Sequence, residues 1–236
     1  MAAGCFSSKH TFWAIFIFQG LHHSHWQQVV QQKEKIMENT TGKPQSATKN
    51  LSIFASGAGS NAKQIINYFR NSSLAKVVLI VCNKPGAGVI SIAEEENIPV
   101  LMIEKENFFR GNGYLRQLQE AKTDLVVLAG FLWKIPQTLI DAYPRRIINI
   151  HPALLPKYGG KGMYGQYIHE AILNAGEMES GITIHYVDEH YDNGDVIFQT
   201  ACPVLDGDTP EDLAHRIHQL EHMHYPLVIE DLVKSL

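Results

Sequence analysis

The chain has 236 residues and a mass of 26.5 kDa, which suits one large domain or one domain with an extension. Hydrophobic residues make up 45% of the chain and charged residues 19%, proportions typical of a folded protein with a sizeable core. The formal net charge of −4 argues against a nucleic acid or an anionic membrane surface bound through bulk charge. No stretch approaches the roughly 18 consecutive apolar residues that a membrane-spanning helix needs.

Cysteine usage indicates the compartment. Cys5, Cys82 and Cys202 are too few and too far apart for a disulfide scaffold or a CxxC metal site. A reducing environment is the simplest interpretation, so we expect a cytoplasmic protein. Histidine is the unusual residue, with 12 copies, and at least one of them should matter for function.

The first fifty residues differ from the rest of the chain. Residues 12–18 read FWAIFIF, which is the minimum length for a secretory signal, and no small-residue cleavage site follows. From Met37 the sequence becomes polar and rich in Gly, Pro, Ser and Thr, as in a tail or linker. We therefore expect residues 1–50 to form a poorly ordered N-terminal extension, with Met37 as a candidate true start.

From Leu51 onward, short apolar runs alternate with helical patterns. Strands are expected at residues 51–56, 76–83, 99–104, 124–130 and 146–151. Helices are expected between them, at residues 60–70, 89–97, 113–122 and 136–142. This alternation predicts an α/β fold with a doubly wound, mostly parallel sheet and right-handed crossovers.

The last part of the chain follows another pattern. Residues 181–189 and 195–205 are longer, partly polar strands, which we expect to form an antiparallel pair near the C-terminus. A closing helix follows, with Asp208 as a plausible N-cap and Pro210 in its first turn.

The loop after the first strand has the features of a phosphate site. Residues 56–62 read SGAGSNA; the glycines let the backbone approach an anion, and the following helix presents free N–H groups. The pattern matches GxGxxA, but the second strand ends without the acidic residue that a dinucleotide site needs. A smaller phosphorylated ligand, with Ser60 and Asn61 as donors, is favoured, and a turn without any ligand stays open.

A second candidate site lies at the end of the fifth strand. Asn149 and His151 point the same way because strand side chains alternate, and Pro152 keeps the backbone of His151 extended. An amide donor beside an imidazole suits a reaction that develops negative charge on a carbonyl oxygen and moves a proton. From these residues alone, a structural histidine beside a capping asparagine fits equally well.

A carboxylate near His151 would raise the pKa of its imidazole. The polar loop at residues 187–194 offers Asp188, Glu189 and Asp192 for this purpose. Composition does not choose among the three.

Taken together, the motifs from about Leu51 to Leu236 resemble the phosphoribosylglycinamide formyltransferase family, the folate-dependent glycinamide ribonucleotide transformylases. The motifs are SGAGSN at 56–61, LAGFLWKIP at 128–136, NIHPALLPKY at 149–158, GITIHYVDEHYDNGD at 181–195 and EHMHYPLVI at 221–229. The resemblance implies a catalytic domain over residues 51–236. It also implies transfer of a formyl group from 10-formyltetrahydrofolate to the amine of glycinamide ribonucleotide, a step of purine synthesis, with no metal.

The resemblance assigns roles to single residues. Asn149 and His151 would stabilise the oxyanion, His151 would move the proton, and Asp192 would tune His151. Two further sets would bind the ligands. The phosphate and ribose of the substrate would contact Gly59, Ser60, Asn61, Ala62 and Glu221, and the folate would contact Asn149 and the run Phe131, Leu132, Trp133, Lys134 and Ile135.

Some of these residues also fit ordinary structural roles. Trp133 could be a core residue and Glu221 a solvated helix charge. The chain departs from the better-known members in the Gly-rich segment at 159–165. It also has His218 where the family often has a basic residue near the phosphate, and Arg110 is a candidate for the folate tail.

Alternative functions follow from the same motifs. A 10-formyltetrahydrofolate hydrolase uses the same Asn-x-His and Asp arrangement but does not need the phosphate loop. A non-catalytic phosphoribosyl- or nucleotide-binding module would need the loop but not the three polar residues. We expect small-molecule partners, no nucleic acid, no membrane, and a monomer or homodimer.

Overall fold

The computed structural model describes residues 47–236. The predicted extension up to residue 46, including the alternative start at Met37, lies outside the described residues. The first strand begins at Lys49, two residues before the predicted strand.

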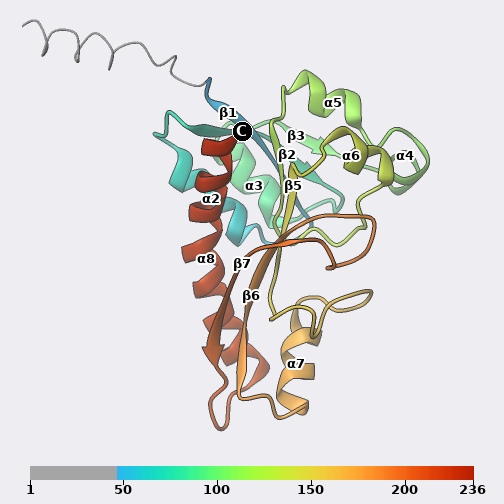
Figure 1. Ribbon diagram of the computed structural model, residues 1–236. Coiled ribbons are helices and arrows are strands. Elements are labelled where there is room, and N and C mark those ends of the chain that lie inside the picture. Colours follow the sequence, from blue (N-terminus) through green and yellow to red (C-terminus); the bar gives the residue numbers. More distant parts are fainter. Residues whose placement is uncertain (1–46) are drawn as a thin grey trace, which may run out of the picture. The chain divides into compact units, whose positions relative to one another are not determined.

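Within the described residues, the strands form one seven-stranded sheet in the order β3-β2-β1-β4-β5-β6-β7 (Figure 1). The strands are β1 (Lys49–Ala55), β2 (Ala75–Cys82), β3 (Val100–Met102), β4 (Leu125–Leu128), β5 (Ile147–His151), β6 (Glu179–Tyr186) and β7 (Val196–Pro203). Strands β1 to β5 pair in parallel, whereas β5, β6 and β7 pair antiparallel. The predicted fold class, a doubly wound mostly parallel sheet with an antiparallel pair near the C-terminus, is confirmed.

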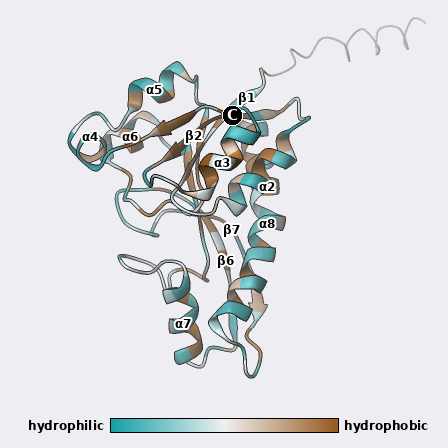
Figure 2. Ribbon diagram, turned by 180° about the vertical axis from the view of Figure 1, so that it is seen from behind, coloured by the Kyte–Doolittle hydropathy of each residue, from teal (hydrophilic) through white to brown (hydrophobic). Residues whose placement is uncertain are grey.

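Helices cover both faces of this sheet. They are α2 (Ser60–Phe69), α3 (Gly88–Glu95), α4 (Lys105–Arg110), α5 (Leu115–Glu120), α6 (Gln137–Ala142), α7 (Gln166–Asn174) and α8 (Pro210–Ser235). Alternate side chains of β1 enter two different cores: Leu51 and Ile53 pack with α2, α3, α7 and α8, whereas Phe54 packs with α4, α5 and α6. Figure 2 shows the apolar strands in brown between helices that carry hydrophilic faces.

Two helices were not expected from the sequence. Helix α4 has only six residues, and α7 follows a Gly-rich segment, so neither offers the long apolar periodicity that marks a helix. Strand β3 is shorter than the predicted 99–104, because it lies at the edge of the sheet and pairs with β2 alone.

The N-cap of α8 differs from the prediction by one residue. Thr209, not Asp208, caps the helix: its hydroxyl oxygen accepts a hydrogen bond from the Asp212 backbone N–H, and the Asp212 carboxylate accepts one from the Thr209 backbone N–H. Asp208 instead forms a salt bridge of 2.8 Å with Arg216. The prediction of Asp208 as the cap is therefore wrong, because an ion pair that the sequence does not reveal occupies its carboxylate.

Helix α8 is fixed to the sheet through a buried hydroxyl. The Tyr225 hydroxyl donates at 2.9 Å to the carbonyl oxygen of Leu128, the last residue of β4, and lies 3.4 Å from the Ile148 carbonyl oxygen within β5. Figure 1 shows α8 running along the sheet beside α2. This bond aligns the helix with the strand ends that carry the candidate site.

We predict that Tyr225→Phe lowers the free energy of unfolding by about 1–2 kcal/mol, because the buried carbonyl groups lose their donor. Tyr68→Phe is the matched control, since the Tyr68 hydroxyl bonds Glu230 at an exposed position and its loss should change stability by less than about 0.5 kcal/mol. Urea unfolding of both variants measures the difference. Equal effects would contradict the anchoring role of Tyr225.

Candidate functional site

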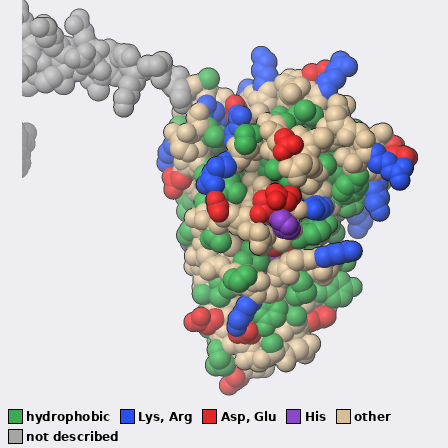
Figure 3. All heavy atoms as spheres, turned by 45° about the vertical axis from the view of Figure 1, so that its right-hand side comes forward, with side chains coloured by type: hydrophobic (Ala, Val, Ile, Leu, Met, Phe, Trp, Pro, Cys, Tyr) green, Lys and Arg blue, Asp and Glu red, His purple; other side chains and the backbone are tan. Residues whose placement is uncertain are grey.

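A cavity of about 690 Å³ opens at the carboxyl ends of β1, β4 and β5. Residues 57–61, 129–132 and 149–152, which follow or end these three strands, form one side of it, and segments before α7 and on α8 form the other. Open α/β sheets bind ligands at this edge. On the face in Figure 3, charged side chains of both signs are interspersed with apolar ones.

The loop after β1 is built to approach an anion closely. Gly59 has φ +80°, and a Cβ atom there would lie 2.8 Å from the Cα of Val89, so only glycine fits. No side chain caps α2, which leaves the N–H groups of its first turn available to a ligand. Ser60 and Asn61 line the cavity. Ala62 does not, because its side chain is fully buried in the core.

Glu221 enters the site from α8. Its side chain is 5% exposed and accepts a hydrogen bond of 2.8 Å from the Asn61 amide. Burial raises the pKa of Glu221 from 4.5 to about 7, while the Asn61 hydrogen bond acts in the opposite direction. The alternative of a solvated helix charge is therefore excluded.

Asn149, His151 and Asp192 come together at the floor of the cavity. The Asp192 carboxylate lies 3.6 Å from His151 Nδ1 and 3.4 Å from Asn149 Nδ2. The Gly160 backbone N–H donates to the other Asp192 oxygen at 2.9 Å and fixes the carboxylate. Asp188 accepts from the His190 backbone N–H within its own loop instead. The structure thus places Asp192 rather than Asp188 beside the imidazole.

The pKa of His151 differs from the sequence prediction. Burial lowers the pKa of this imidazole below its usual range, and the Asp192 charge raises it by less than burial lowers it. The predicted direction of the Asp192 contribution is therefore right, but burial, which the sequence analysis did not weigh, outweighs it. Burial acts to raise the pKa of Asp192, but hydrogen bonds and the His151 charge outweigh it, so this pKa is lowered and the carboxylate is ionised.

Hydrogen bonding assigns the roles of the two His151 nitrogens. His151 Nε2 lies 2.8 Å from the Tyr158 carbonyl oxygen, which can only accept, so Nε2 carries the proton in the neutral ring. Nδ1 then has a free lone pair that faces Asp192. A proton taken up at Nδ1 would be stabilised at once by the carboxylate.

His185 is a further residue of the site, which the sequence analysis does not single out. The antiparallel register pairs it with Asn149, and its Nε2 lies 3.2 Å from Asn149 Nδ2 and 3.7 Å from an Asp192 oxygen. Its Nδ1 lies 2.8 Å from the Tyr186 carbonyl oxygen, which orients the ring. Only the β5–β6 register, which no local pattern specifies, could have revealed this neighbour.

A smaller cavity of about 60 Å³ adjoins the first, and Asn149 and Asp192 line both. The predicted folate residues divide between the two: Trp133, Lys134 and Ile135 line the smaller cavity, Leu132 the larger, and Phe131 both. Trp133 also packs against aromatic rings of Phe108 and Phe109, so it has a core role as well.

The structure places the Gly-rich segment and Arg110 differently relative to the site. The segment at 160–165 lines the larger cavity, opposite the loop after β1. Arg110 is exposed, forms an ion pair with Glu106, and lines neither cavity of the site.

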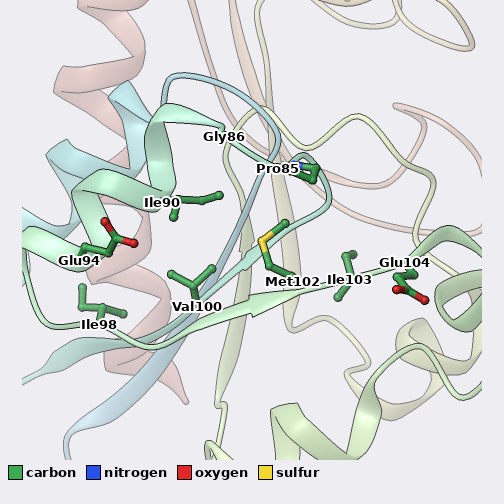
Figure 4. Close-up of a pocket in the computed structure, with 9 residues that line it drawn as sticks. All are labelled: Pro85, Gly86, Ile90, Glu94, Ile98, Val100, Met102, Ile103 and Glu104. Atoms are coloured by element: carbon green, nitrogen blue, oxygen red, sulfur yellow. The ribbon is translucent and has the colours of Figure 1, made fainter.

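Another cavity, of about 620 Å³, lies between α3 and β3 at the edge of the sheet. Figure 4 shows apolar side chains, including Ile90, Val100 and Met102, around it. Its charged residues, Glu94 and Glu104, are both acidic, so it does not suit an anionic ligand. Within residues 47–236, no helix is long and apolar enough to cross a membrane, and no group of three or more potential ligands could hold a metal ion.

Comparison with known proteins agrees with this geometry. Residues 49–229 match the family model described as formyl transferase, and the chain therefore belongs to the formyl transferase family. The chain is 40% identical over 190 residues to phosphoribosylglycinamide formyltransferase of Bacillus subtilis (strain 168), covering 78% of this chain and 95% of the relative. It is 43% identical over 187 residues to the chloroplastic phosphoribosylglycinamide formyltransferase of Arabidopsis thaliana, covering 77% of this chain.

The plant relatives are longer than the matched region. The match spans 64% of the Arabidopsis thaliana protein and 62% of the Vigna unguiculata protein. Among solved structures, glycinamide ribonucleotide transformylase 1 of Geobacillus kaustophilus superposes with a TM-score of 0.72 at 39% identity, covering 79% of this chain and 99% of that chain.

We predict that Asp192→Asn lowers the pKa of His151 further, because it removes the charge that favours the imidazolium. NMR titration of the histidine ring protons measures this pKa. Asp188→Asn is the matched control and should leave it unchanged, since Asp188 bonds within its own loop. A His151 pKa that is unchanged or raised in Asp192→Asn would contradict the arrangement.

Glu221 should make folding stability depend on pH. The unfolded chain releases the Glu221 proton near 4.5 and the folded chain only near 7, so stability falls as the pH rises through this interval. Relative to Glu221→Gln, the wild type should lose about 2–3 kcal/mol of unfolding free energy between pH 5 and pH 8. Denaturant unfolding at a series of pH values measures this loss, and parallel profiles for the two proteins would refute the burial effect.

Proposed function

We propose that this protein transfers the formyl group of 10-formyltetrahydrofolate to the amine of glycinamide ribonucleotide, a step of purine synthesis. The observation that carries the proposal is that two cavities meet at Asn149 and Asp192. The larger leads to the loop after β1, which suits the phosphate of a ribonucleotide. One wall of the smaller is aromatic and apolar and suits the edge of a flat pterin ring, since a volume of about 60 Å³ is too small for the whole folate. A reacting carbon between the two ligands would lie beside the polar residues.

The larger cavity suits the ribonucleotide as a whole. Backbone N–H groups at Gly59, Ser60 and Asn61 would bind the phosphate, and the Ser60 and Asn61 side chains would add donors. Glu221 on α8, which accepts a hydrogen bond from Asn61, would also accept hydrogen bonds from the ribose hydroxyls. Ala62 has only a packing role, because its side chain does not reach the cavity.

The smaller cavity suits the folate. Phe131, Trp133 and Ile135 would contact the face of the pterin ring. Backbone groups near Lys134 and Leu132 would form hydrogen bonds with its polar edge. Asn149 would contact both ligands because it lines both cavities.

The residues at the junction can carry the chemistry. The substrate amine would attack the formyl carbon, and the resulting oxyanion would accept a hydrogen bond from the Asn149 amide. The present contact of that amide with Asp192, at 3.4 Å, is long, so a closer acceptor can replace it. His151, whose Nδ1 carries no proton in the neutral ring, would take the proton of the attacking amine. Asp192 would stabilise the imidazolium that forms. Return of this proton to the folate nitrogen would release tetrahydrofolate.

The alternative functions explain less of the geometry. A 10-formyltetrahydrofolate hydrolase would leave the loop after β1 and Glu221 without a ligand. A non-catalytic binding module would have no use for a buried carboxylate fixed beside an imidazole. The names of the bacterial and plant relatives also support the transferase.

We also propose that the protein is cytoplasmic and is a monomer or a homodimer. The dispersed cysteines favour a reducing cytoplasm, whereas the two plant relatives are named as chloroplastic proteins. Imaging of the full chain with a C-terminal fluorescent tag distinguishes the two compartments. Sedimentation of the purified chain tests the proposed monomer or homodimer.

The proposed activity is tested by supplying 10-formyltetrahydrofolate with and without glycinamide ribonucleotide and following release of tetrahydrofolate. We expect release that depends on the ribonucleotide. Release without the ribonucleotide would identify a hydrolase. No release from a folded sample would favour a binding module.

We predict that His151→Ala lowers kcat for this transfer by about 100-fold or more, the usual contribution of a positioned acid–base group. Folate binding, measured by fluorescence quenching, should survive, because the smaller cavity does not include His151. His224→Ala is the matched control, since His224 packs against Phe198 and lines neither cavity. Near-normal turnover of His151→Ala would remove this residue from its role.

A further inference from the structure

Four histidines gather at the end of the larger cavity that holds the loop after β1. His215, His218 and His222 follow one another at intervals of three and four residues on α8, and His169 comes from α7, which packs against α8. We call these four residues the histidine cluster. His169 and His218 line the cavity itself.

The position of His218 relative to the loop after β1 follows from helix geometry. His218 lies one turn before Glu221 on the same face of α8, because residues three apart are neighbours on a helix surface. Glu221 is bonded to Asn61, which belongs to the first turn of α2. His218 therefore borders the part of the cavity where the α2 N–H groups point.

His169 is an unpartnered imidazole in the wall of this region. It is 3% exposed, and its enclosed Nδ1 atom has no hydrogen-bond partner among the described residues. A buried polar group without a partner is unusual and calls for an explanation. A ligand that favours the imidazolium form supplies one.

Permanent positive charge is scarce here. Among the described residues that line the cavity, only Lys161 is a lysine or arginine, and it lies on the Gly-rich segment before α7. Glu221 adds a carboxyl group to the same region. The α2 N-terminus carries only a partial charge, so a phosphate dianion would not be balanced by fixed charges alone.

We propose that His169 and His218 form a proton-coupled phosphate site, in which binding of a phosphate dianion is accompanied by uptake of a proton from solvent onto the imidazole pair. The proposal deepens the proposed function, since it concerns how the ribonucleotide phosphate is bound. It assigns this chain's affinity for phosphorylated ligands to imidazoles rather than to a fixed cation.

The neighbours of the pair limit the uptake to about one proton. Burial lowers the pKa of His169 to about 4, with a further contribution from His218, and burial and the charge of His215 lower the pKa of His218. The His218 and His222 rings are stacked with centroids 6.1 Å apart, and His218 lowers the pKa of His222 after burial does. A proton on one ring thus opposes a proton on the next. The other titratable groups that line the same cavity are His151, Lys161, Tyr164, Tyr191, Asp192 and Glu221.

Phosphate binding at this site should weaken as the pH rises. In the free protein both rings are neutral at neutral pH, and a bound dianion raises their pKa values. Between the free and bound pKa values the dissociation constant rises as the pH rises, by about tenfold per pH unit for each proton taken up. A fixed cation at position 218 would remove most of this dependence.

Titration calorimetry with ribose 5-phosphate and with glycinamide ribonucleotide tests the proposal directly. Measurements at pH 7.5 in two buffers of different ionisation enthalpy give the number of protons taken up, at a pH where a phosphate monoester with its second pKa near 6 is already mostly a dianion. We expect an uptake of about half a proton or more for the wild type. His218→Gln should weaken phosphate binding about tenfold and reduce the proton uptake. His218→Lys should retain the affinity for phosphate but take up few protons on binding.

Two further variants serve as controls. His224→Gln should behave as the wild type, because His224 belongs to the same helix but packs against Phe198 and does not line the cavity. Glu221→Gln should still take up a proton, which separates the imidazoles from the buried carboxyl. Because His218 is only partly covered by its neighbours, its variants should fold even if a change at the buried His169 does not.

Failure of this inference and failure of the proposed function give different results. Binding of both ligands without proton uptake, or equal uptake by His218→Gln and the wild type, would overturn the histidine site and leave the transferase proposal intact. Proton-coupled binding of ribose 5-phosphate, with no binding of glycinamide ribonucleotide, would support the histidine site and overturn the transferase proposal. Binding of neither ligand would overturn both.

Discussion

The site depends on one fixed carboxylate, that of Asp192. A backbone N–H from Gly160 holds one of its oxygens, while the other lies within 3.4–3.6 Å of Asn149 and His151. This geometry joins the end of β5, the Gly-rich segment before α7 and the loop after β6. Burial alone would keep His151 neutral and make an imidazolium unfavourable, so a nearby anion is needed for the ring to accept a proton during a reaction.

Helix α8 connects this chemistry to the ligand-binding loops. Its Tyr225 hydroxyl bonds the sheet at the end of β4 and within β5, and one turn earlier Glu221 bonds Asn61 beside the loop after β1. One rigid element therefore sets the distance between the anion-binding end of the cavity and the reacting end. The larger and the smaller cavity, which share Asn149 and Asp192, then place two ligands against each other.

Much of the fold could be predicted because its signals are local. The β-branched run at 76–83 and the helix pattern at 60–70 specify a strand and a helix by composition and period, and both elements lie within a residue of the prediction. Elements with weak local signals were missed, such as the six-residue α4. The Asp208 cap was wrong because the competing ion pair with Arg216 depends on side-chain geometry.

The site was predictable to a similar degree. Asn149 and His151 share a face through strand alternation, and the resemblance added Asp192 and Glu221. The net direction of the His151 pKa shift was not predictable, because it depends on how deeply the ring is buried. The place of His185 opposite Asn149 depends on strand register, and the closeness of His169 to α8 depends on packing between distant helices. Neither kind of contact is specified by a short stretch of sequence.

A crystal structure of the protein with glycinamide ribonucleotide and an unreactive folate analogue tests the central claim most directly. The account predicts the phosphate against residues 57–61 and the pterin in the smaller cavity. It also predicts the amine and the analogue's counterpart of the formyl carbon side by side at Asn149, His151 and Asp192. A phosphate bound elsewhere, or ligands that approach each other away from these three residues, would contradict it.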